Sequence, residues 1–447
     1  MKNHMFAGLC VCCAVAVATG SVQSGAQPVT APYTTNLTNL MRGALTGVNV
    51  ATPIPGASLL LMKDGVTFYH QAFGNAQLNE VLNIDSSTKT LSAAAVLSVV
   101  DASPLPFSLD TPLSQYVPGF LATPEKASIT VRQAFSHTSG LPGGEFSGAL
   151  SNPSLTLQQA AALIAQQQLI YGPPGSTFAY GGVSMHAAGA ATEAAAGAPF
   201  VQLVADRITG PLGMTQTRFE LASQTNPRIA GGAVSTARDF GELMEMLRAG
   251  GLARDGTRLL SQAAVQDMFT RQPAQGIPVA SSPLGSADYG VGVWLDRRDA
   301  QGQLTGALAA GARGFSSWID FGAGVVGVFA TDSTSSANVL PFLDLLRDES
   351  ALQALSPRLA GDANLDDRVG IADFARLAAS FNLPGRVWEQ GDFTGDGWTS
   401  IGDFSVLAAN FNLAAPPARG MVPEASSSLA LATAAAWIAG RRRGGPR

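Results

Sequence analysis

The sequence predicts an α+β main domain followed by a small all-α domain. An apolar stretch over residues 57–74 is interrupted by Asp64-Gly65, and an Asp-Gly pair between two such runs is a strong hairpin signal. Residues 86–101 and 158–168 carry Ala, Leu and Gln at helical spacing. Strands at both ends with helices between them indicate one sheet that is built from both termini. The later strand-like runs are 289–296, 314–320 and 324–332.

Length and composition narrow the functional classes. At 447 residues the chain is too long for one ordinary domain, and 46% hydrophobic residues supply ample material for a core. The net charge of -5 argues against a nucleic-acid binder, which is normally basic. The four histidines are scattered without zinc-ligand spacing.

The N-terminus has the layout of a secretory signal peptide. Lys2 is followed by an apolar run over residues 5–18 and then by small and polar residues, so we expect a signal peptide over 1–26 and an exported protein. The alternative is a membrane anchor, but the run is shorter than the roughly 20 residues needed to span. All three cysteines lie in this segment, which excludes disulfides and thiol nucleophiles from the mature chain.

A candidate nucleophile lies at the start of the helix predicted over 86–101. Ser86 and Lys89 have the spacing i, i+3 and share a helical face, whereas Ser87 does not share that face with Lys89. A lysine can act as a base when its surroundings lower its pKa, and the oriented N–H groups of a helix N-terminus favour developing negative charge. The simpler interpretation is a helix start, because Asp and Ser are common N-cap residues.

Longer segments carry a family resemblance. "SSTKTLSAAAVLSVVD" from Ser86, "SLDTPLSQYVPGF" and "ITVRQAFSHTSGLPG" resemble the serine β-lactamase and penicillin-binding-protein superfamily, in particular class C β-lactamases and their esterase relatives. "YGPPGSTFAYGG" and "GGAVSTARDFGELMEML" follow in the family's order, so the resemblance runs from about residue 54 to 332. It implies a serine β-lactamase-like fold for residues 27–350, with an antiparallel sheet of N- and C-terminal strands and a helical subdomain.

The resemblance also implies an acyl-enzyme mechanism without a catalytic cofactor. Ser86 would be the nucleophile, and Lys89 with Tyr180 would transfer the proton. The backbone N–H groups of Ser86 and Ala312, next to Gly311, would form the oxyanion hole. The alternative for Tyr180 is a buried aromatic packed beside the Gly-rich turn.

Two positions depart from the family pattern. Gly182 replaces the Asn or Ser of the tyrosine motif, and Ala309-Ala310-Gly311 replaces Lys-Thr-Gly or His-Thr-Gly. The cation that would bind a substrate carboxylate is missing, and Arg313 is either its replacement or a solvated edge residue. We therefore expect an esterase or amidase, with an ester favoured. His137 in "SHTSG" suggests a catalytic triad, but the resemblance makes that segment structural.

Two other functions stay open at this point. One is a β-lactamase or penicillin-binding, D,D-peptidase activity. The other is a weakly active or inactive scaffold that presents ligands, since the altered positions at Gly182 and Ala309 weaken the expected site.

A repeat follows the main domain after a linker over 351–358. Segments beginning at Gly361 and Gly391 align without gaps at a period of 30 residues and place oxygen-bearing side chains as calcium loops do. Residues 359–414 resemble a type I dockerin, which implies bound Ca²⁺ and a cohesin-type partner; the alternatives are an acidic surface loop and a calcium-stiffened spacer. The expected ligands are Asp362, Asn364, Asp366, Arg368 and Asp373 in the first loop and Asp392, Thr394, Asp396, Trp398 and Asp403 in the second, with Arg368 and Trp398 acting through their carbonyls.

The C-terminal tail over 415–447 joins "VPEASSS", a short apolar segment and three arginines. It resembles the PEP-CTERM sorting signal of bacterial envelope proteins. That resemblance implies transient membrane association during export and an extracytoplasmic protein. The alternative is a plain membrane anchor.

Overall fold

The computed structural model describes residues 30–31, 33–102, 106–144, 148–355 and 358–414. The predicted signal peptide over 1–26 and the predicted sorting tail over 415–447 lie outside the described residues. Within the described ranges, no helix has both the length and the apolar character that a membrane crossing requires.

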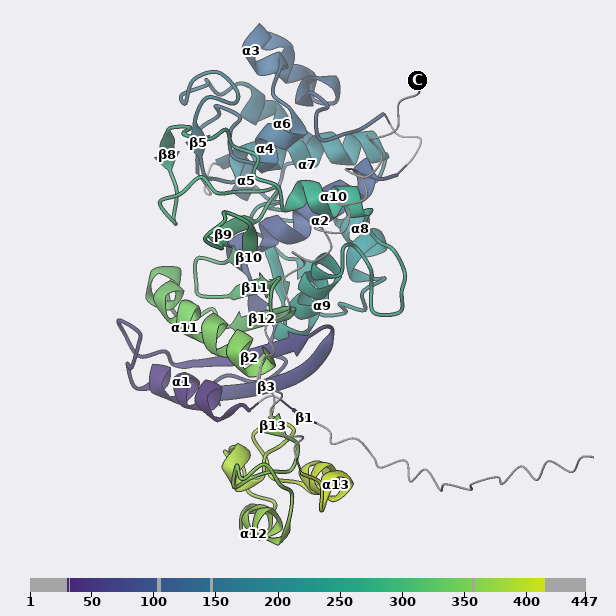
Figure 1. Ribbon diagram of the computed structural model, residues 1–447. Helices are drawn as coiled ribbons and strands as arrows, with labels where there is room; N and C mark the ends of the chain where they lie inside the picture. Colours follow the sequence, from purple (N-terminus) through teal and green to yellow (C-terminus); the bar gives the residue numbers. More distant parts are fainter. Residues whose placement is uncertain (1–29, 32, 103–105, 145–147, 356–357, 415–447) are drawn as a thin grey trace, which may run out of the picture. The chain divides into compact units, whose positions relative to one another are not determined.

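A six-stranded antiparallel sheet forms the centre of the main domain (Figure 1). Its order is β3-β2-β12-β11-β10-β9, so two N-terminal strands join four strands from the C-terminal part of the domain. This confirms the prediction that one sheet is built from both termini. The bounds are β2 Gly56–Lys63, β3 Val66–Gly74, β9 Trp294–Arg298, β10 Leu304–Ala310, β11 Ser316–Asp320 and β12 Val325–Ala330.

The predicted hairpin joins β2 to β3. Lys63 pairs with Val66 across a two-residue turn. Asp64 has φ 47° and Gly65 has φ 81°, and hairpin turns with positive φ at both central residues match the twist of the flanking strands. The Asp64-Gly65 turn therefore allows β2 and β3 to form the hairpin at this edge of the sheet.

The C-terminal strands differ from the prediction in two places. β9 begins at Trp294 rather than at Tyr289, because the preceding residues form a turn in which Gly292 has φ 74°. β10 was absent from the prediction, because its sequence, "LTGALAA", has only Thr as a β-branched residue. It is a strand because β9 and β11 pair with it on both sides, which local propensity does not reveal.

The two faces of the sheet are covered by different helices. Along β2, Leu60 and Met62 belong to the core that includes α9, whereas Leu59 and Leu61 belong to the core shared with α1 and α11. This alternation follows from the period of two along a strand. The covering helices are α1 Thr35–Leu45, α9 Ala237–Arg248 and α11 Ser336–Leu355.

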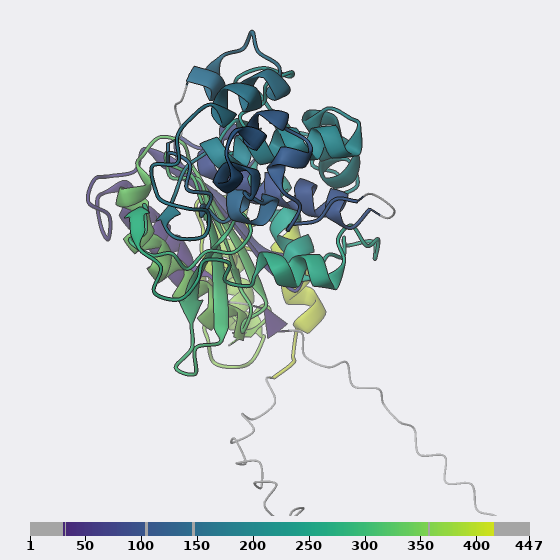
Figure 2. The same ribbon diagram turned by 90° about the horizontal axis from the view of Figure 1, so that it is seen from above.

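The remaining helices gather beside the sheet (Figures 1 and 2). Helix α2 runs through this group, and all its residues from Thr88 to Val99 are buried, including the charged Lys89. The other bounds are α3 Pro124–Ala127, α4 Val131–Phe135, α5 Gly148–Ser151, α6 Leu157–Ala165, α7 Val183–Ala196, α8 Phe200–Val204 and α10 Gln262–Met268. Short strands complete the domain: β4 Leu82–Asn83, β5 Phe178–Ala179, β6 Arg218–Phe219, β7 Ala233–Ser235 and β8 Val279–Ser281.

The C-terminal repeats form a small helical unit of their own. Helices α12 Ile371–Ser380 and α13 Ile401–Asn410 contribute Leu377 and Leu407 to a core around the fully buried Trp388. The predicted linker needs a correction, because α11 continues through Leu355 and residues 351–355 are helical. A short strand, β13 Arg358–Leu359, then pairs with β1 Thr30–Ala31.

Candidate active site

Ser86 and Lys89 face each other where a short 3₁₀ turn, Asp85–Ser87, enters α2. The Lys89 ammonium donates a hydrogen bond to the Ser86 hydroxyl at 3.0 Å and another to the Ala230 carbonyl at 3.0 Å. Lys89 is only 1% exposed, so this contact is shielded from bulk water. The arrangement places an amine beside a hydroxyl in a low-dielectric setting, as nucleophile activation requires.

Ser87 lies on a different face from its neighbour. Its side chain is buried, and its hydroxyl donates to the Phe315 carbonyl at 3.5 Å. Helical spacing from Lys89 predicts Ser86 as the partner, and the structure brings these two side chains together.

Tyr180 comes to the same place from β5. Its backbone N–H donates to the Ser281 carbonyl at 2.9 Å, and its ring stacks on Trp294 at a centroid distance of 5.2 Å. The Lys89 nitrogen lies 4.6 Å from the centroid of the Tyr180 ring, within the range of a cation–π contact. Tyr180, which is distant in the sequence from the neighbouring pair Ser86 and Lys89, thus joins them in one cluster.

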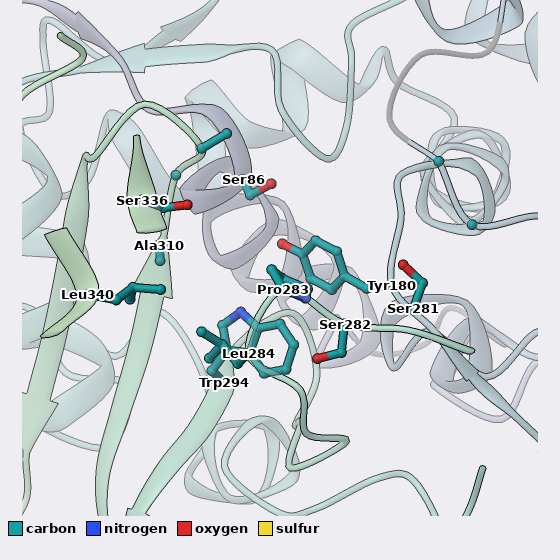
Figure 3. A pocket seen from close by; sticks show the side chains of 14 residues that line it. Ser86, Tyr180, Ser281, Ser282, Pro283, Leu284, Trp294, Ala310, Ser336 and Leu340 are labelled. Carbon is teal, nitrogen blue, oxygen red and sulfur yellow. The ribbon is translucent and has the colours of Figure 1, made fainter. Parts of the chain in front are cut away.

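A pocket of about 460 Å³ opens over this cluster (Figure 3). The Tyr180 hydroxyl is turned toward Ser86 in this view. No Lys, Arg, Asp, Glu or His is among the described residues that line it. The lining residues are Ser86, Gly143, Gly144, Tyr180, Ser281, Ser282, Pro283, Leu284, Trp294, Ala310, Gly311, Ala312, Ser336 and Leu340.

Gly311 lets the end of β10 approach the nucleophile segment. A Cβ at this position would lie 2.5 Å from the Ile84 carbonyl oxygen, which no side chain tolerates. The Gly311 N–H donates to the Phe315 carbonyl at 2.7 Å, which fixes the turn that follows β10. Ala312 and Ser86 consequently line the same pocket, as two donors of an oxyanion hole must.

Of the altered positions, Gly182 and Ala309 lie outside the pocket lining, whereas Ala310 is part of it. The Gly182 N–H donates to the Gly144 carbonyl at 2.7 Å, and this residue precedes α7 as its N-cap. Arg313 forms an ion pair with Asp85 at 2.9 Å, and 46% of its side chain is exposed. This arginine is therefore engaged within the protein rather than directed at a ligand.

His137 packs behind Tyr180 in an aromatic cluster. Its ring centroid lies 4.6 Å from that of Tyr180 and 4.8 Å from that of Tyr289. Neither ring nitrogen has a hydrogen-bond partner among the described residues. Burial and the nearby Lys89 charge hold the pKa of His137 well below its usual value, so the ring is neutral. A neutral packing residue fits this environment better than a triad base does.

Several lining residues were absent from the sequence prediction. Ser281 reaches the pocket because β8 pairs in parallel with β5, which carries Tyr180 at its end. Leu340 comes from α11, and Leu284 from the loop after β8. Only Trp294, in the strand-like run "YGVGVWLD", had a local signal, because that run was already expected to enter the sheet.

The second repeat loop brings three carboxylates together. Oxygens of Asp392, Asp396 and Asp403 lie within 4.8 Å of one another. Burial, together with the charges of Asp403 and Asp396, raises the pKa of Asp392 to about 7. Such concentrated negative charge is unfavourable on its own and suits a hard cation such as Ca²⁺. Thr394 and Trp398 occupy the adjacent loop positions.

The first loop repeats the backbone but fits a cation less well. Within residues 358–414, Asp362, Asp366 and Asp373 form no triple as close as that of the second loop. The Asn364 side-chain amide donates to Asp366 at 3.0 Å, so that carboxylate already has a partner. Arg368 follows at the position of the expected carbonyl ligand.

The repeat also extends to the atoms that shape each loop. Asp373 accepts hydrogen bonds from the Ala363 and Asn364 N–H groups, and Asp403 accepts from the equivalent Phe393 and Thr394. Asp367, with φ 62°, adopts the left-handed conformation that Gly397 adopts in the second loop. That conformation disfavours residues other than Gly, Asn and Asp.

Comparisons with known proteins agree with this architecture. Protein flp of Staphylococcus aureus (strain MW2) is 27% identical over 184 residues, which cover 39% of this chain and 36% of the relative. The D-alanyl-D-alanine-carboxypeptidase/endopeptidase AmpH of Escherichia coli (strain K12) is 31% identical over 148 residues, which cover 32% of this chain and 38% of the relative. The chain therefore matches little more than a third of the length of these relatives.

Solved structures match over more of the chain. A chain from Bacteroides dorei DSM 17855, solved as a β-lactamase candidate, has a TM-score of 0.62 at 25% identity, covering 73% of this chain and 100% of that one. EstCE1, a hydrolase with promiscuous acyltransferase activity, shares the fold with a TM-score of 0.58 at 21% identity, covering 70% and 97%. The Beta-lactamase family model matches residues 37–351. The chain belongs to the Beta-lactamase family, whose members are serine hydrolases.

Proposed function

We propose that this chain is an exported serine hydrolase that cleaves uncharged esters through an acyl-enzyme on Ser86. The observation that carries the proposal is the 3.0 Å contact between the Lys89 ammonium and the Ser86 hydroxyl, under the ring of Tyr180. A hydroxyl and a shielded amine at this distance are the parts that nucleophilic catalysis needs.

The chemistry would proceed in two halves. The Ser86 oxygen attacks the ester carbonyl while its proton passes to the Tyr180 phenolate, which the neighbouring Lys89 ammonium stabilises, and the N–H groups of Ser86 and Ala312 stabilise the oxyanion. The alcohol leaves with the proton that Tyr180 returns. Water then attacks the acyl-enzyme along the reverse proton route and releases the acid and free Ser86.

The lining of the pocket favours an uncharged substrate. A carboxylate brought into it would lose hydration without meeting a cation among the lining residues, since Lys89 is buried beneath Ser86, and burial of an unpaired charge is strongly unfavourable. Arg313, the cation nearest in sequence to Gly311, is held by Asp85. Esters without a carboxylate carry no such penalty.

A fluorophosphonate probe tests this function directly. We expect covalent labelling of Ser86, found by peptide mapping, and none in Ser86→Ala. We also expect turnover of short-chain nitrophenyl esters and none of a chromogenic cephalosporin. Correctly folded protein that the probe does not label would contradict the hydrolase proposal.

The similarity to AmpH favours a second candidate, a β-lactamase or D,D-peptidase activity. It requires stable acylation or turnover with the cephalosporin and no cleavage of short esters. An inactive scaffold, the third candidate, predicts that Ser86→Ala changes no measured activity or bound ligand.

We propose further that residues 359–414 are a dockerin-like domain that holds Ca²⁺. Asp392, Asp396 and Asp403 would bind the ion in the second loop, with Thr394 and the Trp398 carbonyl beside them. Bound Ca²⁺ would neutralise the clustered charge and stabilise the loop. Calorimetric titration of the full chain with calcium tests this.

A cohesin-type protein is the proposed partner of this domain. Equivalent apolar side chains of the two repeats are exposed: Ile371 and Phe374 on α12, and Ile401 and Phe404 on α13. The Phe374 and Phe404 rings lie 6.2 Å apart. Binding to immobilised cohesins with and without chelator tests the pairing, and the spacer alternative predicts no binding in either condition.

Export and tail processing are the last part of the proposal. The layout of residues 1–26 supports cleavage before Gln27, and the PEP-CTERM resemblance supports removal of the tail over 415–447 after transient membrane association. Mass spectrometry of the protein from the envelope and medium would identify both ends. An intact signal segment would contradict export by this route.

A further inference from the structure

A second, smaller cavity borders the pocket over Ser86. It measures about 280 Å³, and two of its lining residues, Leu284 and Leu340, also line the larger pocket. Both leucines are half-buried, and both pack against the core that lies under α11. The two cavities therefore meet at a pair of aliphatic side chains.

The walls of the second cavity are apolar where they continue from these leucines. Leu308 of β10 is 3% exposed and Leu343 of α11 is 1% exposed. Pro341 completes this wall. The surface that follows the catalytic pocket is thus suited to hydrocarbon.

The charged groups of the second cavity are paired with one another or with neighbours. Arg347 is 2% exposed and forms an ion pair with Asp296, which ties α11 to β9. A Cβ at Gly306 would lie 2.7 Å from an Arg347 nitrogen, so β10 makes room for this arginine. Asp344 accepts a hydrogen bond from Arg297 at 2.8 Å. Each of these charged groups thus has an oppositely charged partner, and among the described residues only the buried Nε of Arg347 is left without a hydrogen bond.

The position of Tyr180 gives a direction to the bound ester. A proton donor must lie within hydrogen-bond reach of the leaving oxygen, so the alcohol part lies beside Tyr180. Ala310 and Leu340 lie on the other side of Ser86 from Tyr180 (Figure 3). The acyl part consequently points toward α11 and the second cavity.

We infer that the acyl chain of the substrate runs from Ser86 past Leu284 and Leu340 into the second cavity. The substrate class is therefore esters of medium-length, uncharged aliphatic acids. This inference rests on the proposed ester hydrolysis at Ser86, which it makes more specific.

Nitrophenyl esters of two to twelve carbons, assayed with the full chain, test the inference. Burial of one methylene is worth ~0.8 kcal/mol, which corresponds to about a fourfold gain in kcat/KM. We expect kcat/KM to rise by about this factor per methylene once the chain reaches the leucines, and to level off when the second cavity is full. An octanoate carrying a terminal carboxylate should lose the gain, because it meets only paired charges. A preference for that substrate would overturn the inference.

Two matched variants of α11 locate the effect. Leu340→Trp fills the junction between the cavities and should lower the octanoate-to-acetate ratio of kcat/KM about tenfold or more. Leu345→Trp places the same side chain at an exposed position of the same helix and should leave the ratio unchanged. Circular dichroism and melting curves establish that both variants fold. Leu340→Ala widens the junction and provides a second measurement, in which the ratio of kcat/KM for long chains over acetate should rise instead of fall.

The outcomes separate this inference from the proposed function. Two results would overturn the acyl-chain path while leaving the hydrolase intact. One is a kcat/KM for nitrophenyl esters that falls or stays flat as the acyl chain lengthens. The other is an octanoate-to-acetate ratio of kcat/KM that neither Leu340 variant changes. Absence of any ester turnover together with absence of probe labelling would instead reject the proposed function.

Discussion

Asp85, the residue immediately before Ser86, binds Arg313 through both carboxylate oxygens. Its Oδ1 accepts from the arginine Nη2 at 2.9 Å, and its Oδ2 accepts from Nε at 3.0 Å and from the Arg313 backbone N–H at 3.0 Å. Such two-pronged contacts fix orientation as well as charge. The pair therefore links the segment that carries Ser86 to the turn after β10 and engages Arg313 within the protein.

Asp85→Asn should partly release Arg313 for a substrate carboxylate. Asn tolerates the positive φ of 43° at this position, so the backbone should be preserved. We expect the ratio of kcat/KM for a carboxylate-bearing ester over its neutral analogue to rise roughly three- to tenfold, as loss of about 1 kcal/mol of pairing implies. Asp332→Asn is the control, because Asp332 adds negative charge near Arg313 without the two-pronged contact. An equal change in both variants would contradict this role for Asp85.

Ser86→Ala should abolish both probe labelling and ester turnover. Loss of a nucleophile lowers kcat by about 10³-fold or more, since only binding and oxyanion stabilisation are left. Ser87→Ala is the matched control in the adjacent position, and its buried hydroxyl contacts Phe315 rather than Lys89. If Ser87→Ala lost activity as completely as Ser86→Ala, with the fold preserved, the assignment of the nucleophile would be wrong.

Tyr180→Phe should lower kcat while leaving KM nearly unchanged. The substitution keeps the stack on Trp294 and removes only the hydroxyl. Loss of a proton-transfer group costs about 10²- to 10⁴-fold in rate. Steady-state kinetics on a short ester measures the effect, with Tyr171→Phe as a control outside the pocket. Undiminished kcat in Tyr180→Phe would reduce Tyr180 to a packing residue.

Calcium should raise the melting temperature of the full chain, and chelator should lower it. Asp396→Ala removes one carboxylate of the clustered loop and should weaken calcium binding on the order of tenfold or more. Asp366→Ala is the equivalent change in the first loop. Asp366 accepts a hydrogen bond from the Arg368 backbone N–H, just as Asp396 accepts one from the Trp398 backbone N–H. Because the first loop lacks the close triple, we expect a smaller effect there. An unchanged melt in chelator would count against the calcium proposal.

His186 should lower the free energy of unfolding under acidic conditions. Burial, with a smaller effect of the Arg228 charge and against the hydrogen bond with Asn226, lowers the pKa of His186 from the ordinary 6.5 to about 4. Between these values the unfolded chain binds a proton that the folded chain does not. The contribution of His186 to the free energy of unfolding is therefore complete above pH 6.5 and is lost as the pH falls toward 4. Its magnitude is of the order of 3 kcal/mol.

Urea unfolding at pH 7.5 and pH 4.5 measures this contribution. The free energy of unfolding of His186→Gln should fall less between the two pH values than that of the unaltered chain. Identical pH dependence in the two proteins would show that another group controls acid stability.

Much of the fold was accessible from local patterns, because its signals lie in short segments. Asp64-Gly65 between apolar runs predicts the hairpin at one edge of the sheet, and the start of α2 is marked by Asp and Ser before an apolar stretch. β10 was not accessible, since its Ala- and Gly-rich sequence is a strand only through pairing on both sides. The end of α11 was also missed, because no Gly or Pro stands near the boundary predicted at 351 and the helix continues through Leu355.

The sequence by itself determined the pair Ser86 and Lys89, because helical spacing alone places i and i+3 on one face. It also determined the 30-residue repeat with its regularly spaced oxygen-bearing side chains. Only the tertiary structure decided what surrounds the pair. It brought Tyr180 over Lys89, engaged Arg313 with Asp85, and set Leu340 between two cavities. These contacts join segments that are far apart in the sequence, and no local pattern specifies which distant side chains a folded core brings together.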